Sequence, residues 1–274
     1  MVHAKIAKGR PPAGFKTLLG RYFYFCMALL AGLAVSAAAA QSLTEPPSLV
    51  RLHRHLGGAS VRPYADAHIS VNVVGMAAIT GRPETWLIEV HDSFASIEGV
   101  DKALPPTPFA AMDEGEQPSG DLLAGSRSLI AVYRPGYSYR PEQATQALRQ
   151  ARYCQVGIYR VQAGSEPEFA DLVKSRRNLF DSINLDRPDI AYYVLSGVAS
   201  GTYVFLAPLA SLKALDEGLA KAPAYAESIA AEGAKTAGLT REHLLFRVEP
   251  STSWVTDDFA SADPEFWHGK AKTP

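Results

Sequence analysis

Cysteine is scarce in this chain of 274 residues, which contains only Cys26 and Cys154. Cys26 lies in an apolar run near the N-terminus, so a single cysteine remains if that run is removed. One cysteine cannot form an intramolecular disulfide, and burial of apolar side chains must therefore hold the fold together. Cys154 precedes a predicted strand and has no evident activating histidine, which favours a buried, unreactive thiol.

Acidic residues are absent from the first 40 positions. An apolar run over residues 22–40 follows five basic residues there and ends in alanines. This order is typical of an export signal, although 19 apolar residues are also about enough to span a membrane. We expect a signal peptide at 1–40 and an exported protein, periplasmic or extracellular. The alternative is a retained anchor, which is the only membrane contact that we expect.

Positive charge is also limited in the remainder of the chain. Without the five basic leader residues, 22 Lys and Arg face 28 Asp and Glu, a net charge of −6. Nucleic-acid binding needs clustered positive charge, so we expect no nucleic-acid partner. The sequence also contains no phosphate loop, dinucleotide-binding glycine pattern, zinc signature or nucleophile elbow. We therefore expect no cofactor and no metal, and the sequence does not indicate which reaction the protein would catalyse.

An internal repeat is present instead. The segment "ASIEGVDKAL" (95–104) recurs as "ASLKALDEGL" (210–219), an offset of 115 that also relates 129–130 to 244–245. Upstream, "VRLHRHLGG" (50–58) matches "VGIYRVQAG" (156–164) at offset 106. "VVGMA" (73–77) matches "LSGVA" (195–199) at offset 122. Matches that keep their order over this length predict a duplication.

The second copy reads as β-α-β-β-α-β, the order of a ferredoxin-like unit. In the first copy only "ASVRPYADAH" (59–68) separates the first two strands, which is too short for the helix of about 19 residues in the second copy. We predict an α+β fold of two tandem ferredoxin-like units that form a pseudo-twofold α/β barrel, the first unit lacking its first helix. The predicted segments are a signal peptide, a first repeat, a linker, a second repeat and a C-terminal tail (1–40, 41–140, 141–152, 153–255 and 256–274).

Strand alternation assigns the two faces of the first strand. Arg51, His53 and His55 share one face, which we expect to be exposed because its helix is missing. Val50, Leu52 and Arg54 then face the barrel interior, as do Val156, Ile158 and Arg160 of the second copy.

Two apolar-stranded units of this kind resemble the dimeric α/β barrel superfamily, which includes antibiotic-biosynthesis monooxygenase-like and NIPSNAP-like domains. The segments "GSRSLIAVYRP" (125–135) and "ADPEFW" (262–267) are also similar to exported bacterial proteins with this duplicated plan. The resemblance implies two sheets packed face to face with helices outside. It implies no particular activity.

Few residues are candidates for chemistry. His91 and Asp92 follow a strand and could form a general-base pair, or be solvated loop residues. Arg54 and Arg160 match across the repeat and could bind a carboxylate or phosphate ligand, or pair with nearby acids at the strand ends. His53 and His55 share a face but lack a third metal ligand.

Four functions remain open at this point. The first is a non-enzymatic barrel that binds a small apolar or acidic molecule. The second is a cofactor-independent monooxygenase or isomerase, which needs a His, Asp or Tyr with a perturbed pKa inside the cavity. The third is a haem-binding barrel, which needs an inward histidine. The fourth is a module for a protein partner or a second copy of the chain.

Overall fold

The computed structural model describes residues 44–56, 59–104, 122–123, 128–221, 223 and 239–269. The predicted signal peptide and the acidic segment 113–121 lie outside these residues. In the described part, no helix combines the length and the apolar character needed to cross a membrane.

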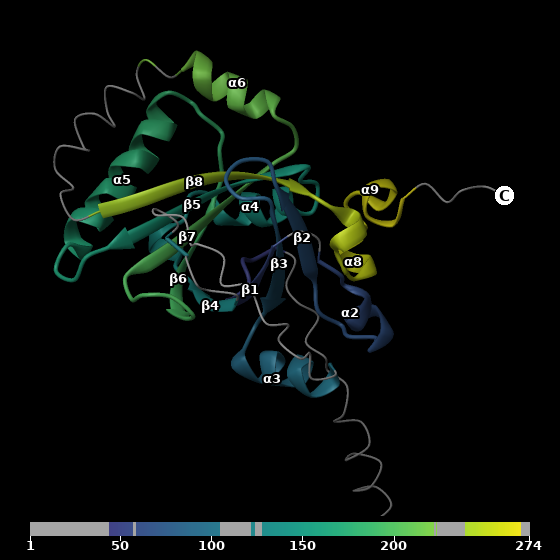
Figure 1. Cartoon of the computed structure of the whole chain (residues 1–274). Coiled ribbons are helices and arrows are strands. Elements are labelled where there is room, and N and C mark those ends of the chain that lie inside the picture. Colours follow the sequence, from purple (N-terminus) through teal and green to yellow (C-terminus); the bar gives the residue numbers. More distant parts are fainter. Residues whose placement is uncertain are drawn as a thin grey trace, which may run out of the picture. The chain divides into compact units, whose positions relative to one another are not determined.

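The first half of the chain contains four strands and two described helices (Figure 1). In chain order they are β1 (Leu49–Leu56), α2 (Arg62–Asp66), β2 (Val73–Ala78), β3 (Glu84–His91), α3 (Phe94–Ala103) and β4 (Ser128–Tyr133). A 3-10 turn (Pro135–Tyr137) and α4 (Pro141–Leu148) follow. The helix α4 thus lies within 141–152, the segment that the sequence analysis assigned to a linker.

The second half repeats this order with a longer first helix. Its elements are β5 (Tyr153–Val161), α5 (Glu166–Ser182), β6 (Ile190–Ser196), β7 (Thr202–Leu209), α6 (Lys213–Ala220) and β8 (Leu239–Val248). A second 3-10 turn (Pro250–Thr252) and the short helices α8 (Asp257–Ala260) and α9 (Pro264–His268) complete the described chain.

The eight strands close into one antiparallel barrel in the order β1-β3-β2-β8-β5-β7-β6-β4. Within each half the order is fourth, first, third, second strand, which is the order of a ferredoxin-like sheet. The halves join where β2 pairs with β8 and where β4 pairs with β6. The predicted fold class, two tandem ferredoxin-like units forming a pseudo-twofold α/β barrel, is therefore confirmed. The residue limits of the two repeats stay a prediction.

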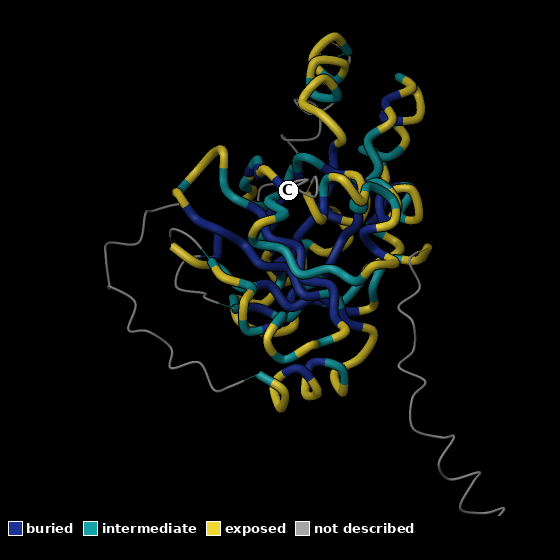
Figure 2. The backbone as a smooth tube through the Cα atoms, turned by 90° about the vertical axis from the view of Figure 1, so that its right-hand side faces the viewer, coloured by how far each residue is buried: buried dark blue, intermediate teal, exposed yellow. Residues whose placement is uncertain are grey.

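The main core lies inside the barrel, where alternate side chains of every strand meet. Val50, Leu52, Val156 and Ile158 point inward, as strand alternation predicted, and all four are buried. At the centre, the rings of Trp86 and Phe246 lie 4.6 Å apart. Figure 2 shows the buried strands as a dark centre beneath the more exposed helices and turns.

The missing helix of the first unit is confirmed. Between β1 and β2 the chain forms only the five-residue α2, whereas α5 has 17 residues at the corresponding place. The prediction that the bared face is exposed is wrong for part of that face. Tyr64 of α2 covers it, and Arg51 is only 8% exposed, although His55 is exposed as expected.

The repeat offset of 115 does not hold on the third strand of each unit. It would match His91 with Leu206, but His91 bonds to groups on the outer face and Leu206 lines the interior. An odd offset there exchanges the two faces, because side chains alternate with period two. The offset does preserve faces on the last strands, where Leu129 and Leu244 are both in the barrel core.

Candidate functional site

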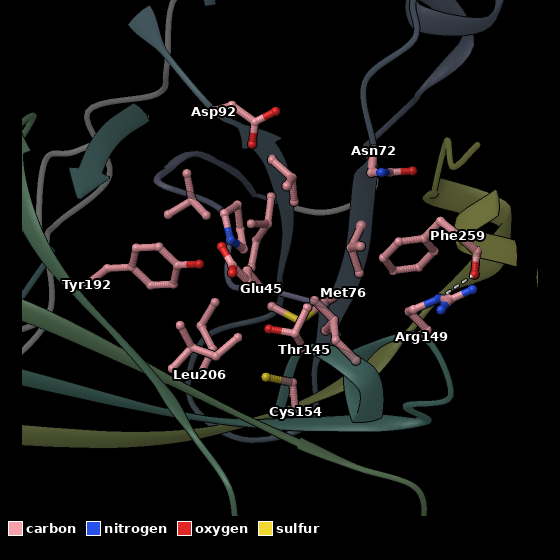
Figure 3. A pocket seen from close by; sticks show the side chains of 17 residues that line it. Glu45, Asn72, Met76, Asp92, Thr145, Arg149, Cys154, Tyr192, Leu206 and Phe259 are labelled. Carbon is pink, nitrogen blue, oxygen red and sulfur yellow. Dashed lines mark hydrogen bonds between the residues drawn. The ribbon is translucent and has the colours of Figure 1, made fainter. Parts of the chain in front are cut away.

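One end of the barrel contains a pocket, shown from close by in Figure 3. Its volume is about 40 Å³. The strands supply apolar side chains, while α4, α8 and the segment before β1 form the rim. The lining residues are Glu45, Pro47, Val50, Asn72, Val74, Met76, Ile88, Val90, Asp92, Thr145, Leu148, Arg149, Cys154, Ile190, Tyr192, Leu206 and Phe259.

The strands contribute the hydroxyl of Tyr192 and the thiol of Cys154 to this pocket. Tyr192 comes from β6 and is 1% exposed, and its hydroxyl points toward the centre of the pocket (Figure 3). Burial, followed by the nearby Tyr133, raises the pKa of Tyr192, so its hydroxyl stays protonated at neutral pH. Cys154 is buried, as predicted, and burial raises the pKa of its thiol to about 12.

The polar groups at the rim are mostly bound to the chain itself. Arg149 of α4 donates from Nε to the carbonyl oxygen of Phe259 at 3.2 Å, the bond drawn in Figure 3. The side-chain oxygen of Asn72 accepts hydrogen bonds from the backbone and hydroxyl of Thr256. These bonds attach the C-terminal segment to the barrel and fix the width of the opening.

The other end of the barrel is closed by Leu122 and Leu123, whose side chains belong to the barrel core. Arg54 donates from Nη1 to the carbonyl oxygen of Leu123 at 2.7 Å, and Arg160 donates to the carbonyl oxygen of Leu122. Arg54 also forms an ion pair with Glu84 at 2.9 Å. The two matched arginines thus meet on one dipeptide of the chain. A role in binding a ligand stays a prediction.

A second polar cluster lies on the outer face of β1 and β3. Glu89 is fully buried, and Arg51 donates to it from Nε at 2.5 Å. The hydroxyl of Tyr64 also donates to Glu89, and the ring nitrogens of His53 and His91 lie 3.2 and 3.0 Å from its oxygens. We call these five residues the Glu89 cluster.

Hydrogen bonding determines the charge of the Glu89 cluster. Burial by itself would raise the pKa of Glu89, but the bonds from His53, His91 and Arg51 outweigh it and hold that pKa well below its usual range. Glu89 is therefore ionised, and the positive charge of Arg51 balances it.

The structure places the side chains of His91 and Asp92 in two different sites. His91 is the last residue of β3 and is fully buried, so the expectation of a solvated loop residue is wrong for it. Its ring lies between Glu89 and Ser96, with the Nδ1 atom 3.0 Å from the Ser96 hydroxyl oxygen. Asp92 is exposed and lines the barrel pocket. A catalytic role for either residue stays a prediction.

Sequence reasoning missed Glu89 and Tyr192, among other residues of these sites. Glu89, and not Asp92, is the carboxylate beside His91. The signal was present, because residues two apart on one strand share a face. Tyr192 was not singled out, since one tyrosine in an apolar strand does not reveal that its hydroxyl enters a cavity. The described residues contain no group of three or more potential ligands that could hold a metal ion.

Comparisons with known proteins bear on the fold alone. No family model matches the chain, and no curated protein matches it. Among solved structures, an anthrone oxidase-like protein has a TM-score of 0.44 at 11% identity, with 75% of this chain and 93% of that chain covered.

Two further structures show a similar degree of likeness. A heme-binding protein from Thermus thermophilus has a TM-score of 0.41 at 10% identity and covers 74% and 95% of the two chains. A mutant chlorite dismutase from Candidatus Nitrospira defluvii has a TM-score of 0.45 at 9% identity and covers 81% and 98%. The strand order of this chain is that of a dimeric α/β barrel with both units in one polypeptide. These distant likenesses carry none of the functional argument.

Proposed function

We propose that this chain is a binding protein whose barrel takes up a small, mainly apolar molecule with one hydrogen-bonding group. The observation that carries the proposal is the barrel pocket, lined by apolar side chains around the inward hydroxyl of Tyr192. Ligand sites in proteins commonly combine an apolar wall with a few polar groups that orient the ligand.

The size of the pocket limits the ligand. A volume of 40 Å³ corresponds to about three waters on the same measure. A molecule of a few non-hydrogen atoms would fit, as would one end of a longer molecule that extends through the rim. A haem macrocycle does not fit this volume, and none of the residues that line the pocket is a histidine. The residues present therefore do not suit haem.

Tyr192 supplies the polar contact in this proposal. Its hydroxyl forms no hydrogen bond to another side chain or backbone group that the described residues reveal. A ligand hydroxyl or carbonyl would supply the partner that a buried polar group otherwise lacks. A purely apolar ligand would leave the hydroxyl unpaired and would bind more weakly.

A series of straight-chain alcohols, from butanol to decanol, tests the proposal by calorimetry on the purified protein. Each methylene that enters the pocket should add about 0.8 kcal/mol of binding free energy, until the chain reaches solvent. The length at which the gain stops then measures the depth of the site. An affinity that does not depend on chain length would contradict the proposal.

Two matched variants locate the site. Val90→Phe adds a ring at a residue that lines the pocket, whereas Val132→Phe adds the same ring on β4 away from it. Both valines are partly buried. We expect Val90→Phe to weaken alcohol binding at least tenfold and Val132→Phe to leave it unchanged. Tyr192→Phe should weaken binding of the alcohols but strengthen binding of the matching alkanes, because an alkane then leaves no buried hydroxyl unpaired.

A cofactor-independent isomerase or oxygenase is a second candidate, favoured by the protonated Tyr192 hydroxyl in the pocket. Asp92 and Glu45 are the carboxylates among the residues that line the same pocket, and we assign the uptake of a proton to Asp92. The probe is deuterium exchange next to the carbonyl of acetone, which has only four non-hydrogen atoms, in heavy water, followed by NMR. Catalysed exchange that is lost in both Tyr192→Phe and Asp92→Asn would support this candidate. Exchange no faster than in buffer would remove it.

We also propose that the chain is exported and cleaved near Ala40. The support is the basic, then apolar, then alanine-rich order of residues 1–40. Intact-mass measurement of the protein recovered from the periplasmic fraction of an expressing bacterium tests this. A full-length mass in the membrane fraction would instead show a retained anchor.

A further inference from the structure

A larger cavity lies outside the barrel, between α5 and the outer face of β5, β7 and β8. In Figure 1 these elements lie together on one side of the barrel. Its volume is about 330 Å³, which is within the range of small-molecule sites. No residue lines both this cavity and the barrel pocket, since the two use opposite faces of the same strands. We call it the α5 groove.

The α5 groove is positively charged in an otherwise acidic protein. Three arginines and one carboxylate line it, Arg176, Arg187, Arg241 and Asp189, which gives a charge of +2 with the histidine neutral. The chain beyond residue 40 has a net charge of −6. The charge of the groove is therefore opposite to that of the molecule.

The arginines are not all neutralised by the protein. Arg176 forms an ion pair with the buried Asp189 at 2.9 Å, but its Nε atom is buried without an acceptor among the described residues. Arg241 is exposed on β8, and no carboxylate of the described chain lies within ion-pair distance of it. An anion in the groove would reach donors that are already oriented.

The pKa of His243 is affected by the same positive charges. Its partial removal from water lowers the pKa of its ring, and the charges of Arg241 and Arg176 lower it further. The ring therefore lies within the electrostatic reach of both arginines. Its neighbour on the groove floor is Tyr159, whose ring centre is 5.7 Å away.

The floor of the groove is aromatic. The rings of Tyr159 and Phe205 lie 5.2 Å apart in an edge-to-face arrangement, and Phe169 of α5 lies 5.5 Å from Tyr159. Gly157 has no side chain, so the Tyr159 ring packs closely over the backbone there. A Cβ atom added there would lie 3.1 Å from the Tyr159 ring and 3.6 Å from His243. Flat apolar groups pack favourably against such rings.

We propose that the α5 groove binds a small aromatic carboxylate, with its ring against the aromatic side chains of Tyr159 and Phe205 and its carboxylate toward Arg176 and Arg241. Aromatic walls select the flat apolar body, and the arginines, which outnumber the carboxylate in the lining, select the negative charge. This site is separate from the barrel pocket, and neither proposal depends on the other.

The test uses 1-naphthoate as the probe, with 1-naphthalenemethanol as its neutral counterpart and inorganic phosphate as an anion without a ring. Binding to the purified protein is measured by calorimetry at low salt. We expect 1-naphthoate to bind at least tenfold more tightly than either control. If the neutral alcohol or phosphate bound as tightly as naphthoate, or if naphthoate did not bind, the proposal would be overturned.

Matched variants on one strand place the probe. Arg241→Gln removes a groove cation, whereas Arg247→Gln makes the same change on the same face of β8, outside the groove. Both side chains are exposed, so both variants should fold, and thermal unfolding checks this. We expect Arg241→Gln to weaken naphthoate binding about tenfold and Arg247→Gln to leave it unchanged. If both variants lost the same binding affinity for naphthoate, general surface charge would explain the effect, and the assignment of the probe to the α5 groove would be overturned.

A variant of the barrel pocket separates the two proposals. Val90→Phe fills the barrel pocket and does not touch the groove. Naphthoate binding that survives Val90→Phe supports the groove as its site. Loss of that binding would place naphthoate in the barrel and contradict the inference, while leaving the proposed barrel function intact.

Discussion

On the outer face of the first half, Arg51 of β1 pairs with Glu89 of β3, whereas in the second half Gly157 of β5 pairs with Phe205 of β7. The five-residue α2 covers the first face, and the 17-residue α5 covers the second. Where a long amphipathic helix is available, its aromatic side chains cover the sheet. Where that helix is missing, polar side chains on the sheet satisfy one another and remain buried.

The two arrangements differ in what they leave open. In the Glu89 cluster, Arg51 and Tyr64 fill the space above Glu89, and the carboxylate accepts hydrogen bonds from both. In the second half, Gly157 has no side chain, and the α5 groove remains beside the helix. The two units therefore share one strand order but differ on their outer faces, one of which is closed while the other contains a cavity.

The aromatic cover of the second half should show the largest single effect. Phe169 of α5 is 2% exposed and contacts the rings of Tyr159, Tyr203 and Phe205. We expect Phe169→Ala to lower the free energy of unfolding by about 3–5 kcal/mol in urea titrations, because it leaves a cavity in a packed core. Leu219→Ala on α6, which removes an exposed side chain, is the control. A loss no larger than in that control would show that α5 is not held by this ring.

The Glu89 cluster should show the next effect in size. Glu89→Gln removes the buried one of the two carboxylates that pair with Arg51, the other being the exposed Asp101. Breaking one partner of a buried pair costs about 3 kcal/mol. Glu98→Gln makes the same change on the exposed face of α3, where the ion pair with Lys102 is solvated, and should have no measurable effect. If the two variants unfold at the same urea concentration, the cluster does not stabilise the first half.

Part of this comparison was accessible from the sequence, and part was not. Strand alternation placed Arg51 and Gly157 on the outer face, because a period of two follows from backbone geometry alone. The alignment of the third strands was less accessible from the sequence. A shift of one residue in the repeat offset exchanges the inward and outward faces of these strands, and the turn residues did not reveal that shift. The cover that Tyr64 provides was also missed, since a five-residue helix leaves no periodic pattern.

Tyr64→Phe sharpens the comparison at a smaller scale. The substitution keeps the ring that covers the first half but removes the hydroxyl that donates to Glu89. A hydrogen bond to a charged group contributes about 1.5–3 kcal/mol, and we expect the lower part of that range because Arg51, His53 and His91 still bond to Glu89. Tyr153→Phe on β5 is the matched control, because no hydrogen bond to its hydroxyl is found in the described chain. A loss as large as that of Glu89→Gln would show that the ring, and not the hydroxyl, had been disturbed.

The smallest effect is a difference in the pH dependence of stability, and it has opposite signs in the two halves. The pKa of Glu89 is lowered, so its contribution is complete above the unfolded value of 4.5 and is lost as the pH falls below it. Burial raises the pKa of Asp189, against the opposing effect of Arg176, so this carboxyl favours the folded state at low pH and loses that contribution as the pH rises from 3.8. We therefore expect the unfolding free energy of the natural protein, measured from pH 3 to 7, to approach that of Glu89→Gln as the pH falls. Relative to Asp189→Asn, the natural protein should gain stability as the pH falls. Slopes of the same sign would mean that both carboxyls are held by their donors, and the contrast between a satisfied cluster and an incompletely paired groove would then be wrong.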